Sequence, residues 1–212
     1  MSGLMNPARW QNCRACGLHA FRRHVVYGDG PLPCELLAIG EAPGETEDLR
    51  GKPFCGPAGN TRKKLWADAE ALAGVPAPAT YITNIVACRP TDERFGRNRT
   101  PTGEEALACH ERLKEIVLGT KPAPVLLMGK VAQRWARELC PDAWELPHPS
   151  AILQDGNTES GQWLGYVRAL SEIFIAIKEG RHGKETKEGL FTELRKATGT
   201  PGKGKAKRRR KG

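Results

Sequence analysis

The chain has 212 residues, of which 39% are hydrophobic, and this length and composition fit one soluble domain with additional segments. Its formal charge of +9 is unevenly distributed, because eight of the 33 basic residues and none of the 24 acidic ones lie in Lys196–Gly212. No apolar run is long enough to span a membrane or to form the core of a signal sequence, so we expect the protein to remain where it is made.

Cysteines are the first chemical feature along the chain. Seven of them, an odd number, in a chain without a secretory signal favour thiols or metal ligands over disulfides. Cys13 and Cys16 form a C-x-x-C pair in a polar segment without clear periodicity. A redox pair of this kind follows a strand and begins a helix, and nothing before Cys13 predicts a strand. The pair therefore indicates a metal site that needs two further ligands.

A loop rich in glycine, proline and carboxylates occupies Gly40–Asn60. It follows the apolar run Leu36–Ile39, which predicts a buried strand, and precedes Thr61–Ala73, which predicts a helix. Open α/β sheets place their sites in such strand-to-helix loops. The carboxylates could act as acids or bases or hold water, and Phe54 offers a flat face. The alternative is a solvated acidic loop anchored by that one aromatic ring.

Positive charges open the helix that follows the loop. Its first turn carries Arg62 and Lys63, where the helix dipole disfavours positive charge. A bound phosphate would reverse that penalty, so both residues are candidates for contact with nucleic acid. A solvated face without a partner is the alternative.

A second strand is predicted at Thr80–Ala87 and must end before Pro90. Asn84 lies within it, and a buried amide must find partners or cost free energy. An amide offers one acceptor and two donors, enough to read the edge of a base, although neighbouring backbone could satisfy it as well.

Two further cysteines complete a possible ligand set. Cys88 follows the second strand, and Cys109 lies in a helix predicted at Gly103–Leu118. Together with Cys13 and Cys16 they come from three separate elements. Such a set suits either tetrahedral zinc or an iron–sulfur cluster, and the spacing leaves both open.

The remaining elements continue the alternation of strands and helices. Strands are predicted at Val125–Met128 and Trp144–Pro147, and helices at Lys130–Leu139 and Gln162–Lys178. This order implies right-handed crossovers and a small parallel sheet covered on both faces. His148 follows the last strand, at the same end of the sheet as the carboxylate-rich loop. An imidazole there could support a developing negative charge or serve only the structure.

These features together resemble family 4 uracil-DNA glycosylases, the iron–sulfur members of the uracil-DNA glycosylase superfamily. The motifs that carry the resemblance are Gly40–Glu45 with Gly51–Gly56, Thr83–Pro90, His148–Ser150 and the four cysteines. The resemblance covers about Cys13 to Lys178. It implies a three-layer α/β/α sandwich with a four-stranded parallel sheet and removal of uracil from DNA. It also implies a 4Fe-4S cluster on Cys13, Cys16, Cys88 and Cys109 that ties the N-terminal segment to the domain.

The resemblance assigns roles in a uracil pocket. Phe54 would stack on uracil, and Asn84 would read its amide edge. His148 would hydrogen-bond the O2 atom, which gains negative charge as the glycosidic bond breaks. Each role needs that type of side chain.

Activation of water falls to a glutamate in this interpretation. Ala42, in the uracil pocket, occupies the position where the best-known branch of the superfamily has an aspartate. We therefore expect Glu41 to position the attacking water, with Glu47 as the second candidate. Glu47 could instead help to exclude the methyl group of thymine, because Gly44 replaces a bulky aromatic residue of that branch.

Two departures from the family concern DNA binding. Residues 91–99 lengthen the segment between Cys88 and Cys109, and their arginines could lie against phosphates. The loop after His148, expected to contact DNA from Ser150 onward, lacks the usual arginine. In it, Ile152 or Leu153 could enter the base stack as uracil leaves it.

The resemblance also predicts the organisation of the chain and its partners. Residues 1–180 would form the glycosylase domain and 181–195 a helical or irregular extension. The composition of 196–212 predicts a disordered basic tail that contacts phosphates, with a solubilising end or a localisation signal as the alternatives. No lysine stands out as a Schiff-base nucleophile, so the enzyme would be monofunctional and leave an abasic site. We expect a cytoplasmic, nucleoid-associated monomer that acts on uracil-containing DNA, away from membranes, with an abasic-site endonuclease following by analogy. The alternative is a non-catalytic iron–sulfur or zinc DNA-binding module.

Overall fold

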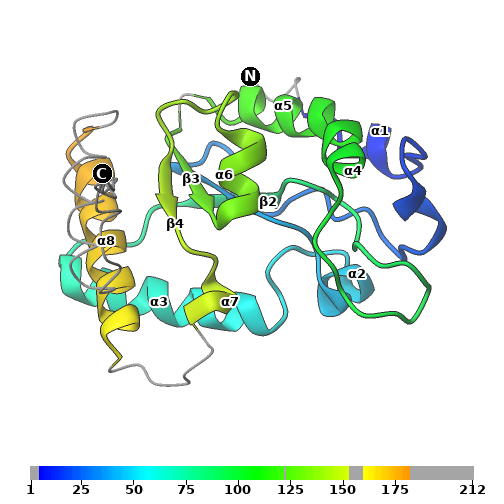
Figure 1. The fold of residues 1–212 in the computed structure, drawn as a ribbon. Coiled ribbons are helices and arrows are strands. Elements are labelled where there is room, and N and C mark those ends of the chain that lie inside the picture. Colours follow the sequence, from blue (N-terminus) through cyan, green and yellow to red (C-terminus); the bar gives the residue numbers. More distant parts are fainter. Residues whose placement is uncertain (1–4, 122, 153–159, 182–212) are drawn as a thin grey trace, which may run out of the picture.

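The computed structural model describes residues 5–121, 123–152 and 160–181 (Figure 1). Its helices are α1 (Pro7–Trp10), the 3-10 helix η1 (Gly17–Ala20), α2 (Glu45–Arg50), α3 (Pro57–Ala73), α4 (Gly103–Ala108), α5 (His110–Gly119), α6 (Lys130–Ala136), α7 (Pro149–Ile152) and α8 (Gly161–Lys178). Its strands are β1 (Leu36–Gly40), β2 (Thr80–Asn84), β3 (Val125–Met128) and β4 (Trp144–Leu146). None of the helices within these ranges is both long and apolar enough to cross a lipid bilayer. The predicted tail, and the predicted extension beyond Arg181, lie outside the described residues.

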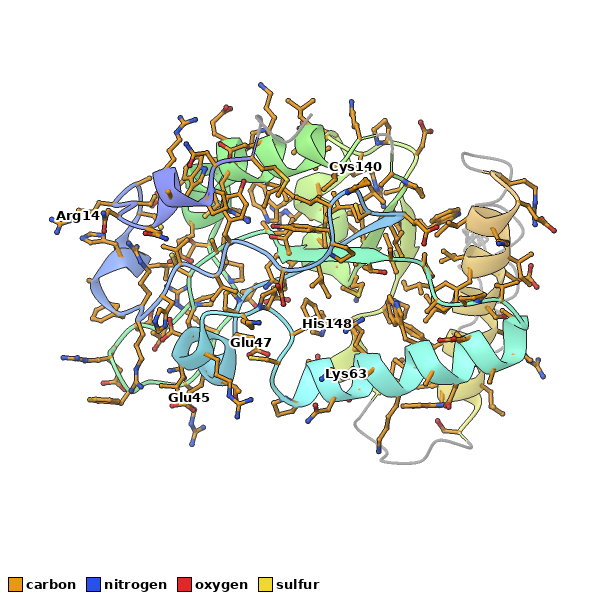
Figure 2. All side chains as sticks on the ribbon, turned by 180° about the vertical axis from the view of Figure 1, so that it is seen from behind. Arg14, Glu45, Glu47, Lys63, Cys140 and His148 are labelled. Carbon is orange, nitrogen blue, oxygen red and sulfur yellow. The ribbon has the colours of Figure 1, made fainter. Side chains whose placement is uncertain are left out.

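The four strands form one parallel sheet in the order β2-β1-β3-β4. Because β1 lies inside the sheet, the chain first adds β2 on one side of it and then β3 on the other. Such a reversal opens a crevice at the carboxyl ends of the strands, where open α/β sheets place their ligands. Gly40 pairs with Asn84 at this end. Glu47 and His148 also lie toward this end, whereas Cys140 lies on the far side of the sheet (Figure 2).

Helices cover both faces of the sheet. Side chains alternate along a strand, so Leu36 and Leu37 of β1 enter different hydrophobic clusters. The cluster of Leu36 includes α3 and α8, whose Trp66 and Phe174 rings meet edge to face with 6.0 Å between centroids. The cluster of Leu37 includes α5 and α6. The predicted three-layer α/β/α sandwich with a four-stranded parallel sheet is confirmed.

Several elements differ from their predicted bounds. The helix expected at 103–118 is divided into α4 and α5 at Cys109, whose ψ of −2° departs from helical geometry. The strand expected at 80–87 ends at Asn84, and the helix expected at 130–139 ends at Ala136. The carboxylate-rich loop contains the six-residue helix α2, which is too short to show a periodic pattern.

Candidate active site

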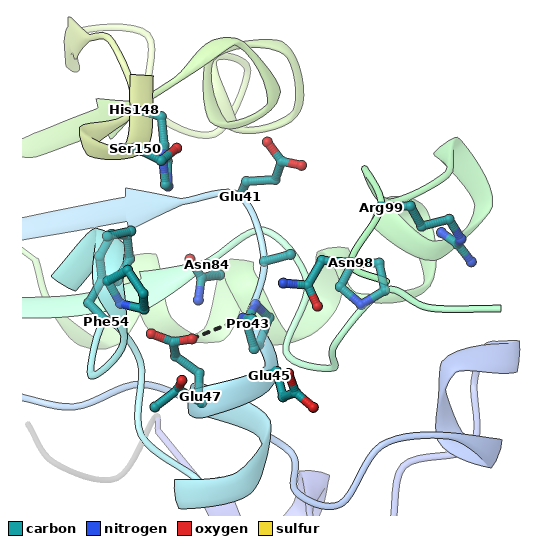
Figure 3. Close-up of a pocket in the computed structure, with 16 residues that line it drawn as sticks. Glu41, Pro43, Glu45, Glu47, Phe54, Asn84, Asn98, Arg99, His148 and Ser150 are labelled. Carbon is teal, nitrogen blue, oxygen red and sulfur yellow. Dashed lines mark hydrogen bonds between the residues drawn. The ribbon is translucent and has the colours of Figure 1, made fainter. Parts of the chain in front are cut away.

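A cavity of about 520 Å³ lies at the carboxyl end of the sheet (Figure 3). Its central polar side chains are Glu41 after β1, Asn84 at the end of β2 and His148 after β4. The full lining is Glu41, Ala42, Pro43, Gly44, Glu45, Thr46, Glu47, Phe54, Pro57, Ala58, Asn84, Pro90, Asn98, Arg99, His148 and Ser150. The structure therefore brings together all the residues predicted to bind uracil or to take part in catalysis.

Phe54 forms one wall of the cavity in an unusual backbone conformation. Its φ of 49° lies in the left-handed region, which costs a bulky residue on the order of 1–3 kcal/mol. Two glycines make room for it. A Cβ atom at Gly40 would lie 2.5 Å from the Phe54 ring, and one at Gly59 would collide with the Phe54 carbonyl. The ring centroid lies 5.9 Å from that of His148, so a flat aromatic face borders the imidazole.

Asn84 has a buried side-chain amide oxygen that lacks a hydrogen-bond partner among the described residues. The residue is only 1% exposed, and a Cβ atom at Gly40 would lie 2.6 Å from that oxygen. An unpartnered buried acceptor costs about 1–3 kcal/mol. A ligand that donates a hydrogen bond here would remove that cost, so the amide is prepared for a polar planar ligand.

Ser150 determines which nitrogen of His148 carries the proton. The Ser150 backbone N–H donates to His148 Nδ1 at 3.2 Å, and Ser150 Oγ lies 2.7 Å from the same atom. Because Nδ1 accepts, the hydrogen of the neutral ring is on Nε2, which remains free to donate. Burial lowers the pKa of His148, although the charge of nearby Glu47 acts in the opposite direction. The imidazole is therefore neutral near pH 7.

The two candidate glutamates have different surroundings. Glu47 is 8% exposed, and its carboxylate accepts hydrogen bonds from the N–H groups of Gly44 at 3.1 Å and Gly56 at 2.7 Å. It thereby joins the start of α2 to the loop that carries Phe54. Glu41 is half-buried in the cavity wall. Burial raises the pKa of Glu41, and a hydrogen bond with Thr100 opposes that shift.

The predicted DNA contacts are less uniform. Lys63 is exposed, but the Arg62 guanidinium lies 5.1 Å from the Trp66 ring centroid, and its Nε atom is buried without a partner among the described residues. Ile152 is only 6% exposed and packs into the core, which does not fit a residue that enters the DNA stack. Leu153 lies outside the described residues. Ser150, predicted to contact DNA, is exposed but already bonded to His148.

Residues 91–99 contribute to the cavity, which the sequence did not reveal. Arg89 is buried and donates to the Gly96 carbonyl at 2.8 Å and to Asn98 Oδ1. These bonds hold Asn98 and Arg99 at the cavity wall. The hydrogen-bond acceptors of Arg89 lie in an irregular loop, so no periodic pattern could have signalled them.

The four cysteines predicted to be ligands lie near one another. Burial raises the pKa of Cys16, and the charges of Cys109 and Cys13 act in the same direction. Burial likewise raises the pKa of Cys88 to about 12, with contributions from Cys109 and Cys16. Arg22 donates to Cys88 Sγ at 3.7 Å and to the Cys13 carbonyl at 2.7 Å. This corner therefore joins the N-terminal segment to the chain after β2.

The spacing of the four thiols bears on the kind of group they could hold. Within the described ranges, no group of three or more His, Cys, Asp or Glu side chains is arranged to hold a metal ion. Tetrahedral zinc with bonds of about 2.3 Å would require sulfur atoms roughly 3.8 Å apart. An iron–sulfur cluster is larger than one ion, so its cysteine ligands stand farther apart. Four thiols are the type of ligand that both tetrahedral zinc and an iron–sulfur cluster use.

Comparisons with known proteins agree with this geometry. The family model described as the uracil DNA glycosylase superfamily matches residues 27–168. The chain is 36% identical over 129 residues to the type-4 uracil-DNA glycosylase of Pyrobaculum aerophilum, covering 61% of each chain. It is 37% identical over 120 residues to that of Saccharolobus solfataricus, covering 57% of this chain and 52% of the relative. It is 38% identical over 124 residues to that of Thermotoga maritima, covering 58% and 60%. The match thus spans between about half and three fifths of the length of these relatives.

Proposed function

The chain belongs to the uracil-DNA glycosylase superfamily, and we propose that it hydrolyses the N-glycosidic bond of uracil in DNA and leaves an abasic site. One observation carries the proposal. The unpartnered amide oxygen of Asn84 lies beside the Phe54 ring in a cavity that also holds the three candidate catalytic side chains Glu41, Glu47 and His148. A planar base with alternating donors and acceptors matches those two groups.

Recognition of the base would use both features. Uracil flipped out of the duplex stacks on Phe54, and its imide edge donates to the amide oxygen of Asn84 while accepting from the amide nitrogen. Ala42 borders the same space with a side chain too small to obstruct the base. The second role considered for Glu47, exclusion of the thymine methyl group, remains a prediction.

His148 would stabilise the leaving group. As the bond between C1′ and N1 of uracil breaks, negative charge develops on the base and positive charge on the sugar. The neutral imidazole donates from Nε2 to the O2 atom of uracil, and Ser150 keeps that hydrogen in place by bonding to Nδ1. A donor aimed in advance at the developing charge costs no reorganisation during the reaction.

Glu41 would position the attacking water. A water oxygen forms the new bond to C1′, and its proton passes to the Glu41 carboxylate as the uracil anion leaves. Glu41 suits this role better than Glu47, because both oxygens of Glu47 already accept backbone hydrogen bonds. Glu47 would instead hold the wall that carries Phe54 in place.

A 4Fe-4S cluster would bind to Cys13, Cys16, Cys88 and Cys109. The proximity of the four thiols and the burial of Cys88 and Cys109 support the assignment. Its contribution would be structural, because it would fasten the N-terminal segment to the residues after β2 and to the junction between α4 and α5. Arg22 already connects the N-terminal segment to the residues after β2, because it donates to the Cys13 carbonyl and to Cys88 Sγ.

We also propose that the protein acts as a cytoplasmic, nucleoid-associated monomer whose product passes to another enzyme. An abasic site must be processed by an activity that cleaves the phosphodiester backbone, such as an abasic-site endonuclease. The tail Lys196–Gly212 would add phosphate contacts, so its removal should reduce the dependence of DNA binding on salt concentration.

The test uses a labelled duplex with a single U opposite G, followed by alkali and a denaturing gel. Wild type should give alkali-dependent cleavage at U and none at a T placed opposite G. Asn84→Ala and His148→Ala should lose most of it, whereas the controls Asn60→Ala and His110→Ala, at residues outside the cavity lining, should retain it. Binding of DNA without cleavage by wild type would favour the non-catalytic DNA-binding module instead.

A further inference from the structure

Arg112, in α5, is the largest fully buried side chain among the described residues, with an exposed fraction of 1%. None of the ion pairs within the described ranges includes it. A guanidinium stays charged in proteins, and burying an unpaired charge is costly unless strong hydrogen bonds compensate. Its position therefore calls for an explanation.

The hydrogen-bond partners of Arg112 are neutral oxygens at the carboxyl end of β2. Its Nη1 atom donates to Thr83 Oγ1 at 2.9 Å and to the Tyr27 carbonyl at 3.0 Å. Its Nη2 atom donates to the Asn84 carbonyl and to the Ile85 carbonyl, the latter at 2.9 Å. Its Nε atom is buried without a partner among the described residues. The positive charge is thus solvated by dipoles and is not neutralised.

These bonds fix the backbone at Asn84. Just beyond β2, the Ile85 N–H donates to the Gly40 carbonyl at 3.0 Å. The carbonyls of Asn84 and Ile85 are buried where the strand has ended, and Arg112 satisfies both of them. The Asn84–Ile85 backbone is thereby fixed from two sides, while the side-chain amide oxygen of Asn84 stays unpartnered among the described residues.

Glu115, which α5 places near Arg112, does not form an ion pair with it. Glu115, about one turn later, accepts from Tyr27 Oη at 2.6 Å, from Trp10 Nε1 at 3.1 Å and from the Asn6 N–H at 2.7 Å. Its carboxylate therefore fastens the N-terminal segment. Electrostatic interactions are weakly screened in a buried, low-dielectric region, so the field of Arg112 extends toward the cavity.

We propose that Arg112 is a positioning residue that holds Asn84 and supplies a permanent positive charge that stabilises the anionic base as it leaves. This inference rests on the proposed glycosylase function. Arg112 does not touch the base. It acts through the Asn84 and Ile85 peptides and through its field, which favours the transition state because negative charge is greater there than in the ground state.

The experiment compares release of uracil and 5-fluorouracil from the same duplex under single-turnover conditions. Fluorine withdraws electrons from the ring, so the 5-fluorouracil anion depends less than the uracil anion on stabilisation by the protein. Arg112→Met should slow release of uracil much more than release of 5-fluorouracil. The ratio of the 5-fluorouracil rate to the uracil rate should therefore rise by roughly tenfold. Arg112→Lys keeps the charge, so its ratio should stay within about twofold of wild type even if both rates fall.

A control is Arg89→Met, which removes another buried arginine that donates to neutral oxygens; its charge, unlike that of Arg112, is paired, because Nη1 lies 3.8 Å from the Glu45 carboxylate. It should leave the ratio unchanged. If circular dichroism shows that Arg112→Met does not fold, Arg112→Gln replaces it as the uncharged variant.

Equal slowing of both bases by the uncharged variant would overturn the proposal and leave Arg112 a structural role. Equal slowing together with loss of visible iron–sulfur absorption would assign it to the cysteine corner, which also contradicts the proposal. If Arg112→Lys raises the ratio as much as Arg112→Met does, the loss of the positive charge is not the cause of the change. A wild type that releases neither base would defeat the proposed function itself, which separates that failure from the others.

Discussion

Two cavities lie at opposite ends of the same sheet, and their linings differ more than their sizes. The cavity at the carboxyl ends has a volume of about 520 Å³, and the second, near the amino ends of β3 and β4, has about 370 Å³. The first contains Glu41 and His148, whose pKa values burial shifts in opposite directions, and the orphaned amide of Asn84. The second is lined mainly by apolar side chains, with Lys121 and Asp142 as its ionisable groups besides Cys140.

Volume alone therefore does not identify a site. Parallel strands bring the loops after their carboxyl ends together, and those loops are free to carry polar side chains because the sheet does not depend on them. In the second cavity, Cys140 is buried, and burial raises its pKa to about 11, so the thiol is neutral near pH 7. Substitutions at the two ends should therefore have unequal effects on activity.

The largest effect is expected at Glu41. Glu41→Gln should lower the single-turnover rate by roughly 10²- to 10⁴-fold, because the amide cannot accept the proton of water. In wild type, burial raises the pKa of Glu41, so the rate should fall as pH decreases through that raised value. The variant should lack this acid limb. A rate within threefold of wild type, or an unchanged pH profile, would contradict the role of Glu41.

His148→Ala should lower the rate by roughly 10²- to 10³-fold, the usual cost of removing a donor to a developing anion. Ser150→Ala removes only the hydroxyl and leaves the backbone N–H bond to Nδ1, so its loss should be about tenfold or less. Measurement of both rates at saturating enzyme tests the order. A Ser150→Ala variant as slow as His148→Ala would mean that the hydroxyl, rather than the backbone, orients the ring.

Phe54→Ala should weaken productive binding by roughly 10- to 100-fold, because stacking of a base on an aromatic ring is worth about 1–3 kcal/mol. The loss should appear in KM more than in kcat. Phe95→Ala is the matched control, since that ring is 76% exposed and lies outside the cavity lining. Equal effects of the two substitutions would show that Phe54 has no special contact with the base.

Arg97→Ala should reduce the slope of log K against log salt concentration for DNA binding by about one unit, as expected for one phosphate contact. Arg97 is exposed on the 91–99 loop beside the first cavity. Lys121→Ala, at the second cavity, should leave the slope unchanged. Equal slopes for both variants would indicate that DNA does not distinguish the two ends of the molecule.

The smallest effect is expected at Cys140. Cys140→Ala should leave uracil release within about twofold of wild type and should lower the melting temperature by only a few degrees, as for the loss of one buried atom. Thermal melts and single-turnover rates measure the two effects. Strong loss of activity in a folded variant would make the second cavity functional and remove the contrast between the two ends.

Much of the fold was predictable because its signals are local. The apolar runs Leu36–Ile39 and Val125–Met128 predict buried strands, and their alternation with helices predicts a parallel sheet. Parallel strands bring the residues at their carboxyl ends to one edge, which predicted that His148 would lie at the same end of the sheet as the loop of Glu41, whereas only the family resemblance placed Asn84 in the same pocket. The two helices α4 and α5 were predicted as one because their separation at Cys109 has no local signal.

The sequence by itself determined the layers of this protein, the edge of the sheet that holds its polar groups and the side chains available there. Only the tertiary structure decided how those groups are held: Glu47 joining two loops, Ser150 setting the tautomer of His148, Ile152 packing inward and Arg112 holding the end of β2. The physical reason is that periodicity arises from neighbours in the chain, whereas a hydrogen bond of a buried group depends on whichever distant segment the fold places beside it.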